Sequence, residues 1–195
     1  MNDKVHVVSQ KTEYDGYLQL RQYTFELSNP NPNQSSPICQ SREVVVTSDS
    51  VHVLLYAPKI DSFVFCEEFR PGVFANAADE NPFLFQCVAG TIEEGETPEE
   101  TARKEVYEET GMSADRLLSI TQVYKSPGML SEKSHLFYSE VEEIPQPGIY
   151  GVDDEVIKTH IISKKKAFEL IENATIRDGA TLLALYWFQL HRGLR

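Results

Sequence analysis

The sequence predicts an α/β fold in which a mixed β-sheet is flanked by helices and preceded by a small strand-rich segment. Strand-like apolar runs recur along the whole chain, whereas a helix with a clear N-cap is signalled at few places. A turn-rich loop, NPNPNQSSP at 29–37, interrupts the first strands. A chain of 195 residues is long enough for one domain with a good core plus a small appendage, which we assign to 48–195 and 1–47.

The expected strands are segments in which apolar residues alternate with polar ones or form short continuous runs. They are 4–10, 16–27, 41–47, 51–56, 62–68, 83–90, 116–125, 134–141 and 156–162. The fourth and fifth of these should form a hairpin around Lys59–Asp61. The stretch 72–82 is rich in turn-forming residues and is expected to be a loop.

The first predicted helix begins after Thr97. Thr97 is a good N-cap, Pro98 suits the first helical position, and Glu100 completes a capping box. Gly111 supplies a C-terminal stop. Local signals therefore define both ends of this helix.

Two further helices are expected near the C-terminus. Ser163 should cap a helix at 164–173, and Asp178 should cap a final helix that runs to about 191. The large apolar residues of this last helix are expected to belong to the core: Leu185, Trp187, Phe188 and Leu190.

Acidic residues line one face of the helix after Thr97. Glu105, Glu108 and Glu109 fall at i, i+3 and i+4, while Ala102 and Val106 can face a core with the carboxylates directed outward. Carboxylates so close together repel one another unless a cation lies among them, and all-oxygen ligands suit Mg²⁺ or Mn²⁺. Magnesium in turn suggests a phosphate substrate. A solvated acidic helix is the alternative.

Residues 90–112 carry an ordered motif around this helix. Its fixed positions are Gly90, Glu96, Lys104, Glu105, Val106, Glu108, Glu109, Gly111 and Met112. This spacing resembles the Nudix box of hydrolases that act on nucleoside-diphosphate-linked compounds, except that Lys104 stands where Arg is usual. Lys keeps the charge but loses the planar fork, so we expect a looser brace. The resemblance implies an α/β/α sandwich and metal-dependent hydrolysis.

Similarity to the ADP-ribose pyrophosphatase branch of that family extends beyond the box. Glu67–Pro71 follows an apolar run, Pro127 lies downstream of the box in a Ser-Pro-Gly loop, and Gly148–Glu155 is an acidic loop. Arg177–Thr181 and the tail LLALYWFQLHR also resemble it. The GDP-mannose hydrolase branch shares nearly all these landmarks.

The resemblance implies a set of metal ligands and a cofactor. Glu105 and Glu109, one turn apart, are the first candidates, and the carbonyl of Ala89 matches a backbone ligand of the family. Glu108 is expected to act directly or through water. The expected cofactor is Mg²⁺ or Mn²⁺, with two to three ions in each site.

The general base is expected in the acidic loop. Alignment on the following strand puts Glu155 at a metal-binding position and Asp153 at the base position. Asp stands where the family has Glu, which shortens its reach, so Glu155 is an alternative base. A solvated charged loop is the other reading.

Four residues are candidates for binding the substrate, and each of them has an alternative, purely structural interpretation. Arg70 and Arg42 can bind phosphate or a terminal ribose because guanidinium forks match phosphate oxygens, or they form surface ion pairs. Tyr17 can stack on a base or be a half-buried strand aromatic. Glu132 can accept a bond from a ribose hydroxyl or be a surface acid.

Composition limits partners and compartment. The net charge of −12 disfavours a nucleic-acid partner. No segment reaches the length that spans a bilayer, and the N-terminus lacks a signal-peptide core. The three cysteines show no zinc spacing, and Cys66 and Cys87 lie in apolar runs, which favours buried thiols and a reducing cytoplasm. The family resemblance implies a homodimer built through the first strands.

Three functions remain open from the sequence. The first is hydrolysis of ADP-ribose to AMP and ribose 5-phosphate, and the second is the same chemistry on GDP-mannose or another sugar nucleotide. The third is a non-catalytic nucleotide sensor, against which the intact acidic face of Glu105, Glu108 and Glu109 argues.

Overall fold

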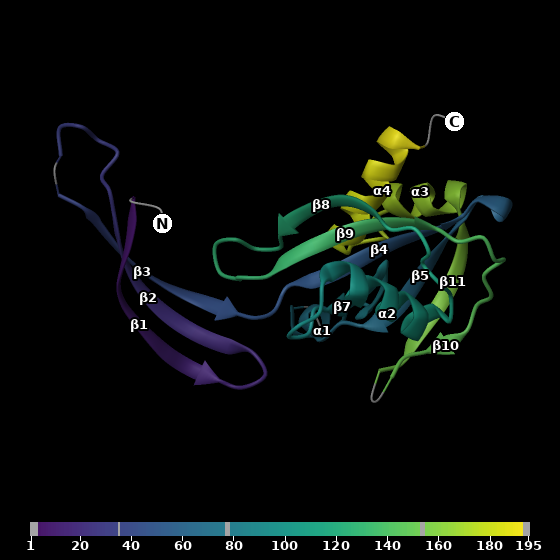
Figure 1. Ribbon diagram of the computed structural model, residues 1–195, viewed down its shortest axis with the longest axis horizontal. Helices are drawn as coiled ribbons and strands as arrows, with labels where there is room; N and C mark the ends of the chain where they lie inside the picture. The colour runs from purple at the N-terminus through teal and green to yellow at the C-terminus, as the bar shows by residue number, and fades with distance from the viewer. Residues whose placement is uncertain (1–3, 35, 77–78, 153–154, 193–195) are drawn as a thin grey trace. The chain divides into compact units, whose positions relative to one another are not determined.

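The structure, a computed structural model, describes residues 4–34, 36–76, 79–152 and 155–192. The chain divides into a small unit, 1–49 with 124–133, and a large unit, 50–123 with 134–195. Figure 1 labels helices and strands of both units.

The small unit is a three-stranded antiparallel sheet in the order β1-β2-β3. Its strands are β1 (Val5–Asp15), β2 (Gln19–Leu27) and β3 (Ile38–Val46). The segment 124–133 joins it through a bridge between Val45 and Leu130 and a bond from Thr47 N–H to Ser131 Oγ. The three strands expected here are confirmed, with β1 and β3 longer than predicted.

The large unit contains a mixed sheet in the order β10-β11-β5-β4-β9-β8, with β6 paired to β5 and β7 paired to β4. β4 and β9 are parallel, whereas β10 with β11, β11 with β5, β5 with β4, β5 with β6 and β4 with β7 are antiparallel. Its strands are β4 (Ser50–Ala57), β5 (Ser62–Phe69), β6 (Phe83–Gln86), β7 (Val88–Thr91), β8 (Leu118–Tyr124), β9 (Lys133–Glu140), β10 (Ile149–Tyr150) and β11 (Ile157–Ser163). β4 and β5 form the expected hairpin around a 3₁₀ turn, Pro58–Ile60.

Alternation along β4 and β5 gives this sheet two apolar faces. Val53 and Val64 belong to a buried cluster with Ala102 and Val106 of α2 (Pro98–Thr110). On the other face, Leu54, Phe63 and Phe65 pack with α3 (Lys164–Glu172) and α4 (Gly179–His191), in a cluster that includes Ala167, Leu185 and Phe188. Figure 1 shows α2 on one side of the sheet and α3 and α4 on the other. The expected α/β/α sandwich is confirmed.

Three expectations about elements were wrong. The presumed loop 72–82 contains a short helix, α1 (Pro71–Asn76). The single strand 83–90 is broken at Cys87, because β6 pairs with β5 while β7 pairs with β4, and Cys87 N–H donates instead to Thr181 Oγ1. Leu190 is 74% exposed, whereas Leu185 and Phe188 are buried as predicted.

The caps of all three predicted helices are confirmed, since Thr97, Ser163 and Asp178 each accept a backbone N–H of the first turn. Among the residues described, no helix is long and apolar enough to cross a membrane.

Candidate active site

The local sequence determines where α2 begins and ends. Thr97 N–H donates to Glu100 Oε2 at 2.8 Å, and Glu100 N–H donates to Thr97 Oγ1 at 3.3 Å, which is the predicted capping box. At the other end Gly111 adopts a left-handed φ of 69° and donates its N–H to the Tyr107 carbonyl. The acidic residues of α2 therefore sit on a helix with two well-defined ends.

Glu109 is buried, which corrects the expectation that all the carboxylates of this helix point outward. It is only 2% exposed. Its Oε1 accepts the N–H of Ala89 at 3.3 Å, and its Oε2 has no hydrogen-bond partner among the described residues. Burial raises the pKa of Glu109 to about 8, although the Cys66 thiol and the Ala89 N–H act in the opposite direction.

Glu105 lies one helical turn away and packs against the loop that precedes α2. A Cβ added to Gly90 would lie 2.1 Å from Cδ and Oε1 of Glu105, so only glycine leaves room for this carboxylate. Burial, together with the negative charges of Glu108 and Glu155, raises the pKa of Glu105 to about 7, although the positive charge of Lys104 acts in the opposite direction. These carboxylates thus share one electrostatic environment.

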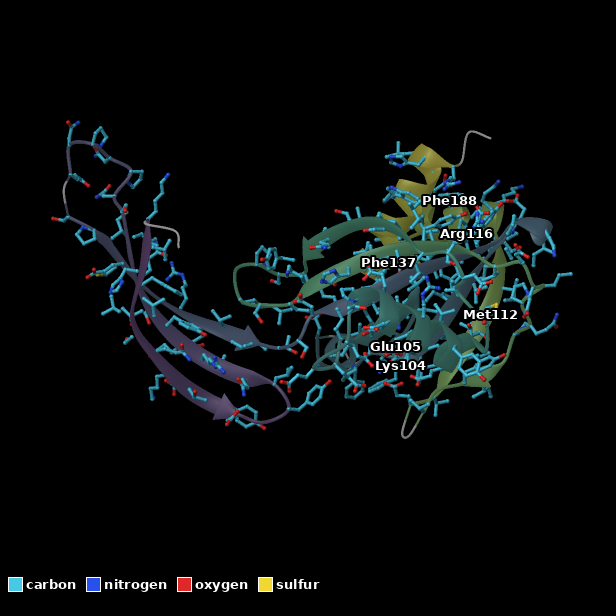
Figure 2. All side chains as sticks on the ribbon, in the orientation of Figure 1. Lys104, Glu105, Met112, Arg116, Phe137 and Phe188 are labelled. Carbon is cyan, nitrogen blue, oxygen red and sulfur yellow. The ribbon has the colours of Figure 1, made fainter. Side chains whose placement is uncertain are left out.

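Lys104 joins the loop before α2 to the helix through two ion pairs. Its Nζ lies 2.8 Å from Glu93 Oε1 and 3.1 Å from Glu96 Oε1. A hydrogen bond from Thr101 and a second from Lys104 lower the pKa of Glu96. Figure 2 labels Lys104 and Glu105 on α2. A lysine here bridges two separate carboxylates, where an arginine fork would suit a bidentate contact with one.

The donor set of this face fits a hard divalent cation. A buried carboxylate oxygen without a partner is costly, and Glu109 Oε2 is such an atom. Two carboxyls with raised pKa values lie near further negative charge, which a cation would relieve. Within the described part of the chain, no three His, Cys, Asp or Glu side chains already converge around one point, so the fit rests on the unpartnered oxygen and on this repulsion.

Two other predicted metal ligands, Ala89 and Glu155, lie in the large unit. Ala89 is on β7, paired with His52 of β4, and is joined to Glu109 by its N–H. Glu155 precedes β11 and donates its N–H to Val152 O at 3.1 Å. Its negative charge raises the pKa of Glu105. Asp153 lies outside the described residues.

Arg70 follows β5 in a polar network that the sequence alone did not indicate. Its Nε donates to Gln86 Oε1 at 2.7 Å, and one terminal nitrogen lies 3.0 Å from Glu68 Oε2. Gln86 also donates to Glu68 at 2.8 Å, and the charge of Glu68 raises the pKa of Glu109. Glu68 was missed, although its spacing of two residues from Cys66 puts both on the same face of β5.

The remaining substrate candidates belong to the small unit. Arg42 is exposed on β3 and donates to the Ser41 carbonyl. Tyr17, between β1 and β2, is 94% exposed, so it is not the half-buried strand aromatic of the alternative reading. Glu132 forms an ion pair with Lys125 at 2.7 Å.

Comparison with known proteins gives a consistent result. The sequence profile of the NUDIX domain matches residues 47–184. The chain is 33% identical over 189 residues to the ADP-ribose pyrophosphatase of Escherichia coli K12, covering 96% of this chain and 88% of that protein. It is 30% identical over 190 residues to the GDP-mannose pyrophosphatase of Salmonella typhimurium, covering 97% of each. A crystal structure of an ADP compounds hydrolase superposes with a TM-score of 0.74 at 17% identity, over 96% of this chain and 94% of that one.

Proposed function

Because this chain belongs to the Nudix family and is a Nudix pyrophosphatase, we propose that it hydrolyses the pyrophosphate bond of ADP-ribose to AMP and ribose 5-phosphate. The observation that carries the proposal is the buried Glu109 with its unpartnered oxygen, one turn from Glu105 on the face of α2 that meets Gly90. The name of the E. coli relative supports the choice of ADP-ribose.

The residues proposed to hold divalent metal are Glu105, Glu109, Glu155 and the carbonyl of Ala89, with Glu108 acting directly or through water. Mg²⁺, as two or three ions, would polarise phosphorus and lower the pKa of the attacking water. Mn²⁺ is the alternative because it accepts the same oxygen ligands.

The chain's own side chains supply the other functions. Lys104 holds Glu93 and Glu96 at 2.8 and 3.1 Å, which keeps the loop before α2 fixed beside Glu105. Arg70, whose guanidinium already contacts Gln86 and Glu68, is proposed to bind a phosphate oxygen. Either Asp153 or Glu155 is proposed to take the proton of the attacking water.

The small unit is proposed to form a homodimer and to bring Tyr17, Arg42 and Glu132 to the substrate. Every residue of its strand β1 is exposed. None of the described residues of the small unit belongs to either buried apolar cluster. A three-stranded sheet gains stability by covering a face. Light scattering should give twice the chain mass of 22.1 kDa; a single-chain mass at micromolar concentration would contradict the dimer.

GDP-mannose is the second candidate substrate. The Salmonella relative named for that activity matches this chain over as large a share as the E. coli enzyme does. We propose a cytoplasmic location for either activity, because Cys66 and Cys87 are buried free thiols.

The test is hydrolysis of ADP-ribose, GDP-mannose, ADP-glucose, NADH and a diadenosine polyphosphate, each with Mg²⁺, Mn²⁺ or EDTA. We expect AMP release from ADP-ribose to have the largest kcat/KM and to stop in EDTA. Faster GMP release from GDP-mannose would assign the chain to the second candidate, and turnover that persists in EDTA would contradict the metal proposal.

A further inference from the structure

The segment that leads through β10 to Glu155 begins at Gly148, and Gly148 is hydrogen-bonded to β11. Gly148 N–H donates to Thr159 Oγ1 at 2.9 Å, and Thr159 N–H donates to Gly148 O at 2.9 Å. Thr159 is 1% exposed and pairs with Cys66 of β5. The start of this segment is therefore anchored on the central sheet.

The ring of Tyr150 connects this anchored segment to α2. A Cβ added to Gly148 would lie 2.4 Å from Tyr150 Cε2, and one added to Gly111 would lie 3.2 Å from Tyr150 Cε1. The ring thus occupies the space beside two glycines that come from distant parts of the sequence. Gly111 is the C-cap of α2, the helix that presents Glu105 and Glu109.

Glu155 lies against Gly151, the residue that follows Tyr150. Gly151 has a φ of 112°, and a Cβ there would lie 2.5 Å from the carbonyl oxygen of Glu155. Glu155 N–H donates to Val152 O at 3.1 Å. These contacts place the backbone of Glu155 against Gly151, which is bonded directly to Tyr150.

We propose that Tyr150 is a positioning residue, whose ring, wedged between Gly111 and Gly148, sets the place of Glu155 relative to Glu105 and Glu109. This inference rests on the proposed hydrolysis, because it concerns the geometry of the same carboxylates. A misplacement of about 1 Å can lower turnover about 100-fold, so a residue that touches no substrate can control the rate.

Two substitutions remove the contact in different ways. Tyr150→Ala deletes the ring, and Gly148→Ala pushes it aside, because the three atoms nearest to the added Cβ all belong to Tyr150. We expect each to lower kcat by about 10- to 100-fold with KM changed less than about threefold. Tyr150→Phe keeps the ring and should retain kcat within about twofold.

The double variant gives the sharpest outcome. Once the ring is absent, the added methyl of Gly148→Ala has lost its neighbour, so Gly148→Ala/Tyr150→Ala should be no slower than Tyr150→Ala alone. Gly179→Ala is the matched control, because a Cβ there meets no atom within 4 Å, and its kcat should be unchanged. Multiplied losses in the double variant, or a slow Tyr150→Phe, would overturn the proposal.

Amide hydrogen exchange supplies a readout that does not depend on activity. Tyr150→Ala should speed exchange at Gly148 and Thr159, whereas Tyr150→Phe should not. If the wild type hydrolyses no pyrophosphate while this exchange pattern holds, the proposed function is wrong, but the structural role of the Tyr150 ring is supported. If the wild type is active but Tyr150→Ala keeps its kcat and its exchange rates, the inference about Tyr150 fails alone.

Discussion

Replacing Glu109 by Gln should stabilise the metal-free protein at alkaline pH, although it removes a charged group from the proposed active site. Glu109 is 2% exposed, and its pKa is raised from 4.5 to about 8, first by burial. A rise of this size corresponds to about 5 kcal/mol at 1.36 kcal/mol for each pKa unit. Because water penetration and relaxation reduce such penalties, we expect a gain of about 1–3 kcal/mol above pH 8.

The pH dependence follows from where the proton is held. Between pH 4.5 and about 8 the folded chain keeps the Glu109 proton that the unfolded chain has released. The free energy of unfolding of the wild type therefore falls as pH rises through this window. Gln does not titrate and its carbonyl can still accept the Ala89 N–H, so the gain of the variant should be absent near pH 4.5 and grow towards pH 8–9.

Urea unfolding in EDTA at pH 5, 7 and 9 measures this difference directly. Glu99→Gln is the matched control, because it neutralises an exposed carboxylate on the same helix and should show no gain that grows with pH. A Glu109→Gln protein that is less stable than the wild type at pH 9, or whose difference from it does not change with pH, would refute the burial argument.

Three further outcomes are expected. Gly90→Ala should lower kcat at least about 10-fold with little change in the melting temperature, because its Cβ would displace the flexible Glu105 carboxylate; a normal kcat at a normal melting temperature would contradict that contact. Lys104→Met should lower kcat by about 3- to 10-fold because it frees Glu93 and Glu96, whereas Lys104→Arg should keep kcat near the wild-type value. Steady-state kinetics of both variants test this, and a Lys104→Met protein with the wild-type kcat would contradict the role of the two ion pairs. In calorimetry of the metal-free protein, Mn²⁺ should bind the wild type at least about 10-fold more tightly than Glu105→Gln, and equal affinities would exclude Glu105 as a ligand.

Local signals made α2 predictable. Thr97, Glu100 and Gly111 form their caps with near neighbours in the sequence, so both ends of α2 were predictable without the rest of the fold. The spacing of Glu105, Glu108 and Glu109 predicted that they share one face of the helix, but it did not predict that Glu109 is buried. Glu109 is buried because β7 and β5 pass beneath it, and no local pattern reports that.

The features that escaped prediction depend on distant partners. The break at Cys87 arises because β6 and β7 pair with different strands, while the apolar run itself is continuous. The contact of Tyr150 with Gly111 joins residues far apart in the chain. The roles of all the proposed site residues remain predictions.

The most direct test of the account is the initial rate of AMP release from ADP-ribose by wild type and Glu109→Gln, each with Mg²⁺ and with EDTA. We expect Mg²⁺-dependent release by the wild type and a loss of at least about 100-fold in the folded variant. A folded Glu109→Gln protein that releases AMP at the wild-type rate would contradict it.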